Sequence, residues 1–203
     1  YFYDKYSICI IDLKKINLKS SIRKIVEKFY NDTFIMDQNA CSSPHLIFWK
    51  NYDIKKINNF WNELNHYISL RYETTKELYL LKYFKLNEIL LKSKIIVKRL
   101  KLNHLNVYKL KKIDESIIDL RGYSGVFFEY KMKNLNLLNR IYSRKFQTVT
   151  YYGIEKKKLV NFIKKNNLNG IDRIVPLGKA IDLDIVWDGL DIVENLTRII
   201  DIT

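Results

Sequence analysis

The stretch Asp37-Gln38-Asn39-Ala40-Cys41-Ser42-Ser43-Pro44-His45-Leu46-Ile47-Phe48-Trp49 sets a cysteine in a polar loop that runs directly into an apolar segment. A helical pattern ending near Asp32 precedes it, so we expect a helix, a loop and a strand in that order. Structural cysteines usually lie within apolar runs, as Cys9 does between Ile8 and Ile10. Cys41 has small polar neighbours instead, where a thiol is accessible and can be activated as a thiolate. Cys41 is therefore a candidate nucleophile, although no base is obvious beside it.

Strand-like segments and helical patterns alternate along the chain. The segments rich in Ile, Val, Phe and Tyr that predict strands are 7–11, 46–49, 95–98, 105–110, 125–131, 147–152 and 173–177. Apolar residues at helical spacing predict helices over 20–30, 53–70, 74–91, 136–144 and 155–165. This alternation predicts an α/β fold with a mainly parallel sheet. Because no repeat or linker is visible, we expect one domain over residues 1–203.

The composition is that of a folded protein. The chain has 203 residues, of which 47% are hydrophobic, and only six Gly and two Pro, which argues against disorder. No apolar run approaches the roughly 20 residues that cross a bilayer, so we expect no membrane span. The chain starts at Tyr1 without a charged leader, unlike a signal peptide. The contrasting settings of Cys9 and Cys41 indicate reduced thiols and a cytoplasmic location.

The net charge of +14 raises the possibility of a nucleic-acid partner. The lysines are spread along the chain, however, with short clusters only at 109–112 and 156–158. No signature of a nucleic-acid-binding fold accompanies them. We therefore favour solvated basic faces over a nucleic-acid groove, and keep a basic module for nucleic acid or an acidic partner as the alternative function.

Several segments, in order, resemble the acyl-CoA reductase family related to the bacterial luminescence fatty-acid reductase (LuxC-like), a branch of the aldehyde dehydrogenase superfamily. The 37–45 loop resembles the family's nucleophile loop, and the segments 4–12 and 147–153 resemble strands of the family. The densest match is Gly170-Ile171-Asp172-Arg173-Ile174-Val175-Pro176-Leu177-Gly178-Lys179-Ala180, followed by Trp187-Asp188-Gly189 and Leu196-Thr197-Arg198.

The resemblance implies a three-layer sheet with helices on both faces, as in an aldehyde dehydrogenase catalytic domain. It also implies that Cys41 attacks an acyl thioester, and that hydride from NADPH reduces the acyl-cysteine to an aldehyde. Implied partners are acyl-CoA or an acyl-carrying protein, an acyl-protein synthetase, and a second copy in a homo-oligomer. In this superfamily a dinucleotide-binding half precedes the cysteine loop, yet no Gly-rich turn opens a helix after a strand here. We therefore expect the chain to be the catalytic half of a longer protein, or an inactive fragment of that fold.

Two neighbours of Cys41 are candidate supporting residues. Asn39 could donate a hydrogen bond to the acyl oxygen, although we favour a capping role in the loop. His45 could lower the pKa of the thiol or shuttle a proton, and the alternative is a structural hydrogen bond at the start of the strand. Asp37 and Gln38 are interpreted as turn formers. We propose no metal, because His66 and His104 lack ligand partners at suitable spacing.

Carboxylates with known roles in the superfamily have no clear counterparts here. The glutamate that activates deacylating water would fall at or before Tyr1, and Asp4 is interpreted as a turn residue. The element that grips the cofactor ribose aligns with 121–125, which lacks its glutamate. Glu129 could replace it, but we expect a solvent-facing strand carboxylate. The acidic residues of the C-terminal segment are interpreted as loop and helix-cap residues, and comprise Asp182, Asp184, Asp188 and Asp191.

Overall fold

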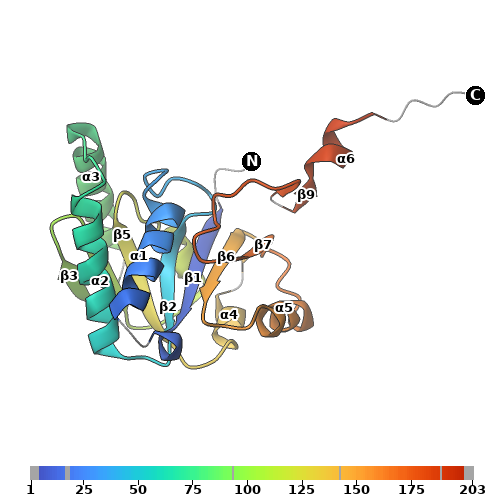
Figure 1. Ribbon diagram of the computed structural model, residues 1–203, viewed down its shortest axis with the longest axis horizontal. Helices are drawn as coiled ribbons and strands as arrows, with labels where there is room; N and C mark the ends of the chain where they lie inside the picture. The colour runs from blue at the N-terminus through green and yellow to red at the C-terminus, as the bar shows by residue number, and fades with distance from the viewer. Residues whose placement is uncertain (1–4, 17–18, 93, 142, 188, 199–203) are drawn as a thin grey trace, which may run out of the picture.

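The computed structural model describes residues 5–16, 19–92, 94–141, 143–187 and 189–198. Its centre is a seven-stranded sheet with the order β3-β4-β5-β2-β1-β6-β7 (Figure 1). The strands are β1 (Tyr6–Asp12), β2 (Pro44–Lys50), β3 (Ile96–Lys101), β4 (Asn106–Leu110), β5 (Val126–Met132), β6 (Phe146–Tyr152) and β7 (Arg173–Pro176). Only β3 pairs antiparallel, with β4, so the predicted, mainly parallel sheet is confirmed.

The strand β1 lies inside the sheet, between β2 and β6, because most of its side chains on both faces are apolar. It pairs with β2 through Ile8 and Leu46, and with β6 through Ile8 and Val149. Ile8 and Ile10 enter the core on one face, whereas Cys9 and Ile11 enter the core on the other. Strand alternation thus builds two cores from one sequence run.

Helices cover both faces of the sheet, which confirms the predicted three-layer architecture. The helices α1 (Lys19–Thr33) and α2 (Ile54–Ser69) pack on the face of Cys9 and Ile11 (Figure 1). Buried residues of α3 (Lys76–Lys92), α4 (Leu137–Arg140) and α5 (Lys156–Lys165) belong to the core on the opposite face. Two short 3-10 helices cover Leu13–Lys15 and Glu115–Asp119. Among the described helices, none is both long and apolar enough to cross a membrane.

The fourth predicted helix is wrong in its length. A helix was expected over 136–144, but α4 ends at Arg140. Ser143 explains the early end, because its hydroxyl accepts from the Lys145 N–H and its carbonyl accepts from the Phe146 N–H. These bonds form a turn that leads into β6 and compete with helical pairing.

The expectation that Glu129 faces solvent is also wrong. Glu129 is buried on β5, and its Oε2 accepts hydrogen bonds from the indole N–H groups of Trp49 and Trp61, both at 2.9 Å. Trp49 lies on β2 and Trp61 on α2. The carboxylate therefore joins the helix to two neighbouring strands inside the core.

The C-terminal part of the described chain leaves the sheet, as Figure 1 shows. It forms a small hairpin of β8 (Val186–Trp187) and β9 (Leu190–Asp191), followed by α6 (Ile192–Leu196). Asp191 caps α6 by accepting from the Glu194 N–H, as a helix-cap residue does. The hairpin was not predicted. Asp4 and Asp188 lie outside the described residues.

Candidate active site around Cys41

Cys41 lies in the loop of residues 34–43 that joins α1 to β2, here called the Cys41 loop. Its side chain is partly exposed, whereas Cys9 is fully buried in β1. Burial raises the pKa of the Cys9 thiol well above its ordinary value, and this disfavours the thiolate. Of the two cysteines, Cys41 is therefore the one that a substrate can reach.

The backbone at Cys41 is fixed to the centre of the sheet. The Ser7 hydroxyl donates a 2.7 Å hydrogen bond to the Cys41 carbonyl oxygen, and the Thr148 N–H donates to the same Ser7 hydroxyl oxygen at 3.1 Å. The Ser43 hydroxyl donates to the Asp32 carbonyl oxygen at 2.8 Å. Because Ser7 and Thr148 belong to β1 and β6, the loop is positioned by two adjacent buried strands.

Gln38 connects the Cys41 loop to the segment 121–125 that precedes β5. Its side-chain amide donates to the Val126 carbonyl at 2.9 Å and accepts from the Gly125 N–H at 3.1 Å. Asp37 and Gln38 both have left-handed φ values, 51° and 61°, so they do form a turn. Gln38 is also buried and bridges two loops, a role that the sequence analysis missed. The segment 121–125 is therefore held against the start of the Cys41 loop.

Asp37 adds a second connection through Tyr72, which follows α2. The Tyr72 hydroxyl donates to the Asp37 carboxylate at 2.6 Å and lies 2.9 Å from the Ser124 hydroxyl oxygen. Burial, and then the contact with Asp37, raise the pKa of Tyr72 above its ordinary value, so the phenol stays protonated.

Position 125, where the segment 121–125 enters β5, requires a glycine. Its φ is +90°, and a Cβ atom would lie 2.6 Å from the His104 carbonyl oxygen. The same carbonyl accepts a 2.6 Å hydrogen bond from the buried Lys82 amine. Burial lowers the pKa of Lys82 to about 8.

His45 is a buried neutral imidazole. Its Nδ1 accepts from the Gly122 N–H at 3.2 Å, which leaves the ring proton on Nε2. Burial, and then the charges of Arg121 and Lys85, lower the pKa of His45 to about 3. The ring packs against Tyr6 with 5.4 Å between centroids. His45 therefore carries no charge near neutral pH with which to stabilise a thiolate.

Asn39 is exposed, and its N–H donates to the Met36 carbonyl at 2.7 Å. The three sequence-predicted residues thus share one segment but differ in environment: Asn39 is in solvent, Cys41 is half-buried and His45 is in the core. Among the described residues, no three His, Cys, Asp or Glu side chains are placed to hold a metal ion.

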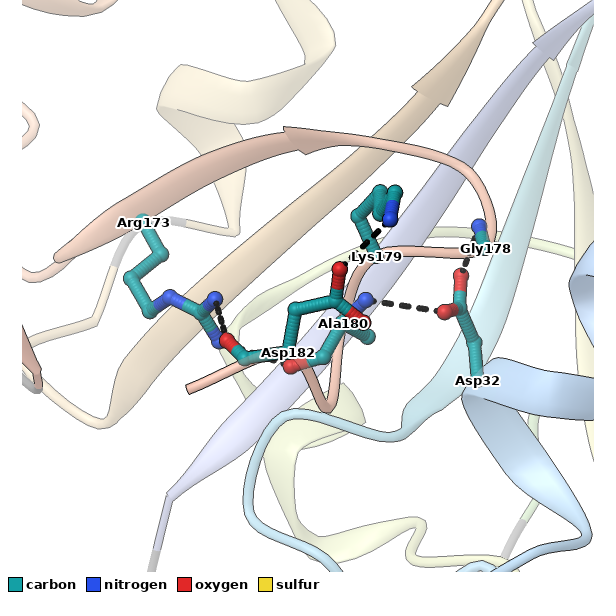
Figure 2. Close-up of polar contacts among 6 residues, drawn as sticks. All are labelled: Asp32, Arg173, Gly178, Lys179, Ala180 and Asp182. Carbon is teal, nitrogen blue, oxygen red and sulfur yellow. Dashed lines mark hydrogen bonds and ion pairs between the residues drawn. The ribbon is translucent and has the colours of Figure 1, made fainter. Parts of the chain in front are cut away.

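Asp32 is a further site residue that the sequence analysis missed. Its carboxylate oxygens accept from the Gly178 N–H at 2.7 Å and the Ala180 N–H at 2.8 Å (Figure 2). Arg173 donates to the carbonyl oxygens of Ala180 and Asp182 from the other side. We call this arrangement the Asp32 clamp. It fixes residues 178–180 to the end of α1, from which the Cys41 loop begins.

The Asp32 carboxyl is unusually basic. Burial raises its pKa to about 6, although the two backbone N–H donors and Arg173 act in the opposite direction. The neighbouring carboxylate of Asp182 adds to the rise. The position of Asp32 in the last turn of α1 is a signal that the sequence contains. An acidic residue there opposes the helix dipole and needs hydrogen-bond donors from elsewhere.

Comparison with known proteins adds a family and a fold. A sequence model described as acyl-CoA reductase (LuxC) matches residues 1–104, the part that includes the Cys41 loop. The predicted resemblance is thereby confirmed. No curated protein sequence matches the chain.

Solved structures of aldehyde dehydrogenases share the fold. Aldehyde dehydrogenase C from Pseudomonas syringae, in complex with NAD+ and octanal, has a TM-score of 0.54 at 8% identity, over 85% of this chain and 39% of that one. A 1-pyrroline-5-carboxylate dehydrogenase from Thermus thermophilus has a TM-score of 0.51 at 10% sequence identity, over 85% of this chain and 35% of that one. A propionaldehyde dehydrogenase from Clostridium phytofermentans has a TM-score of 0.50 at 10% sequence identity, over 88% of this chain and 42% of that one. The chain thus spans less than half the length of each.

Proposed function

Because this chain belongs to the acyl-CoA reductase (LuxC) family, we propose that it forms the catalytic part of an enzyme that reduces an acyl thioester to an aldehyde. The observation that carries the proposal is the anchored Cys41 loop, with its half-buried thiol held at the end of the central strands. The aldehyde dehydrogenase fold supports chemistry on an aldehyde or its thioester precursor.

In the proposed reaction, the Cys41 thiolate attacks the thioester carbonyl, and the carrier thiol leaves with its bonding electron pair and takes up a proton. The product is an acyl group in thioester linkage to Sγ. The Cys41 N–H is the donor we assign to the oxyanion of the tetrahedral intermediate. Ser7 has a positioning role, because it holds the carbonyl oxygen of Cys41 and so fixes the loop backbone.

A nicotinamide cofactor, which we propose to be NADPH, would supply the hydride that reduces the acyl group. The residues present do not form its pyrophosphate site, because the sequence contains no Gly-rich turn between a strand and a helix. We propose that this site belongs to another part of the full-length protein, and that residues 121–125 contact the cofactor from this side. Residues 1–203 alone should then bind NADPH more weakly than micromolar.

The test uses the full-length protein, a long-chain acyl-CoA and NADPH. Intact-mass spectrometry without NADPH should detect one acyl group, which peptide mapping assigns to Cys41, and aldehyde should form when NADPH is added. Cys41→Ser should lose both signals, because serine is a weaker nucleophile without a base. Cys9→Ser is the matched control and should retain both. Aldehyde formation by Cys41→Ser at the wild-type rate would refute the mechanism.

A further inference from the structure

A concave site lies at the opposite end of the sheet from Cys41. The Cys41 loop enters the amino end of β2, whereas this cavity of about 720 Å³ is lined by residues at and beyond the carboxyl ends of β2, β4 and β5. Its lining comprises Tyr52, Lys109, Leu110, Lys111, Tyr130, Lys131, Lys133, Asn134, Asn136, Leu137 and Arg140. We call it the basic crevice.

The topology places this crevice where α/β proteins commonly bind ligands. After β2 the chain passes to α2, which packs on the face of Trp49, and after β5 it passes to α4, which packs on the opposite face. The connections of two neighbouring parallel strands therefore diverge at their carboxyl ends. Such divergence opens a crevice outside the sheet, at the position where ligands of open α/β sheets are found.

The charge of the crevice is of one sign. Five of its lining residues are cations, four lysines and Arg140, and none of the described lining residues is acidic. The Lys109 amine donates to the Tyr52 hydroxyl at 3.1 Å, and the amines of Lys109 and Lys131 lie 5.1 and 5.3 Å from the centre of the Tyr52 ring. Tyr52 thus holds two like charges close together. A concave wall lined by one sign of charge concentrates counter-ions of the other sign.

We propose that the basic crevice binds a small molecule that carries a chain of phosphate groups. Its volume is within the range of small-molecule sites, and a single phosphate would leave most of it empty. Lysines bind phosphate as point charges, and an arginine adds a two-pronged donor. The ligand class is therefore a nucleoside polyphosphate or an inorganic polyphosphate, which share this chemistry. The proposal is independent of the reaction at Cys41.

The test measures binding to the full-length protein by isothermal titration calorimetry, with sodium tripolyphosphate, ATP and adenosine as probes. We expect saturable binding of one tripolyphosphate or one ATP, and none of adenosine. Equal affinities for tripolyphosphate and ATP would assign recognition to the phosphate chain, and tighter ATP binding would add recognition of the nucleoside. Absence of saturable binding of both phosphate probes at millimolar concentration would overturn the proposal.

Two variants of equal charge separate the crevice from the general basicity of the protein. Lys109→Gln/Lys131→Gln should weaken binding about tenfold or more, because two phosphate contacts are lost. Lys156→Gln/Lys157→Gln removes two exposed lysines of α5 and should change affinity less than about twofold. Lys133→Gln/Arg140→Gln also removes two positive charges from the crevice but leaves Tyr52 and its lysine partners intact. A similar loss of affinity in this variant would show that the loss does not come from misfolding around Tyr52. Equal losses in crevice and control variants, or far tighter binding of a single-stranded RNA oligonucleotide than of ATP, would overturn the proposal.

Discussion

The Ser7 hydroxyl donates its hydrogen bond directly to the backbone carbonyl oxygen of Cys41, across 34 positions of sequence. The same oxygen of Ser7 accepts from Thr148, so one buried hydroxyl connects the candidate nucleophile to two strands of the sheet. The reactivity of Cys41 should therefore depend on a residue that does not contact the substrate.

Ser7→Ala should lower both stability and acyl transfer. The variant leaves the Thr148 N–H and the Cys41 carbonyl without their shared partner, which costs about 1–3 kcal/mol of unfolding free energy. Urea unfolding and the rate of Cys41 acylation measure the two effects. Ser69→Ala is the matched control, because Ser69 donates an equally short bond, 2.7 Å, to a carbonyl but is exposed on α2. Equal effects of the two variants would contradict a positioning role for Ser7.

His45→Gln should leave the pH profile of Cys41 alkylation unchanged. With a pKa of about 3, His45 is neutral throughout the range in which a thiol titrates, so its loss removes no positive charge. The measurement is the iodoacetamide rate against pH in a Cys9→Ser background. A clear rise in the apparent thiol pKa would instead favour the alternative role of His45 as a thiolate-stabilising group.

Asp32 should make the protein less stable as the pH rises. Its pKa is raised from 3.8 to about 6 in the folded state, so the folded form holds the proton more tightly than the unfolded form. The stabilisation that comes from this proton is fully present below about pH 4 and is lost as the pH rises through about 6. The free energy of unfolding should fall across this window in the wild type, and fall less in Asp32→Asn.

Asp182→Asn supplies the companion measurement. Removing this neighbouring carboxylate should lower the pKa of Asp32 and move the stability change to lower pH. The shift can be followed by urea unfolding at several pH values. An unchanged window would show that Asp182 does not influence Asp32.

Glu129→Leu should destabilise the protein strongly. Two buried indole N–H groups would lose their acceptor, at a cost of about 1–3 kcal/mol each. Glu129→Gln keeps an oxygen acceptor and should cost less, so the order of stability should be wild type, Gln, Leu. Tryptophan fluorescence during urea unfolding follows Trp49 and Trp61 together with Trp187. Glu155→Leu, at an exposed carboxylate before α5, should have little effect.

The elements with strong apolar patterns could be predicted from the sequence, and the long-range polar partners could not. Ile8 to Ile11 and Leu46 to Trp49 are buried on both faces, so their apolar runs are read as strands, and the strands extend one or two residues further. The early end of α4 was missed because a serine turn overrides helical spacing. Cys41 was singled out by its polar neighbours.

Glu129 and Asp32 show why the rest was missed. The alternation of side chains along a strand leads one to expect a charged strand residue in solvent. Glu129 is buried instead, because its carboxylate accepts hydrogen bonds from Trp49 and Trp61, which lie 80 and 68 positions away in the sequence. The N–H donors of Asp32 lie 146 and 148 positions away. Local patterns carry no information about partners at such separations, which depend on how the whole sheet is assembled.

The position of β1 inside the sheet also affects how the protein can be made. Its second neighbour, β6, follows it by about 140 residues, so one edge of a largely apolar strand stays uncovered until translation has passed Val149. At roughly 5–20 residues per second, that interval is on the order of 7 to 28 seconds on the ribosome. An exposed strand edge of this kind pairs readily with other chains. We therefore expect chaperones to bind the nascent chain, and products truncated before β6 to aggregate, because an early strand lies inside the sheet.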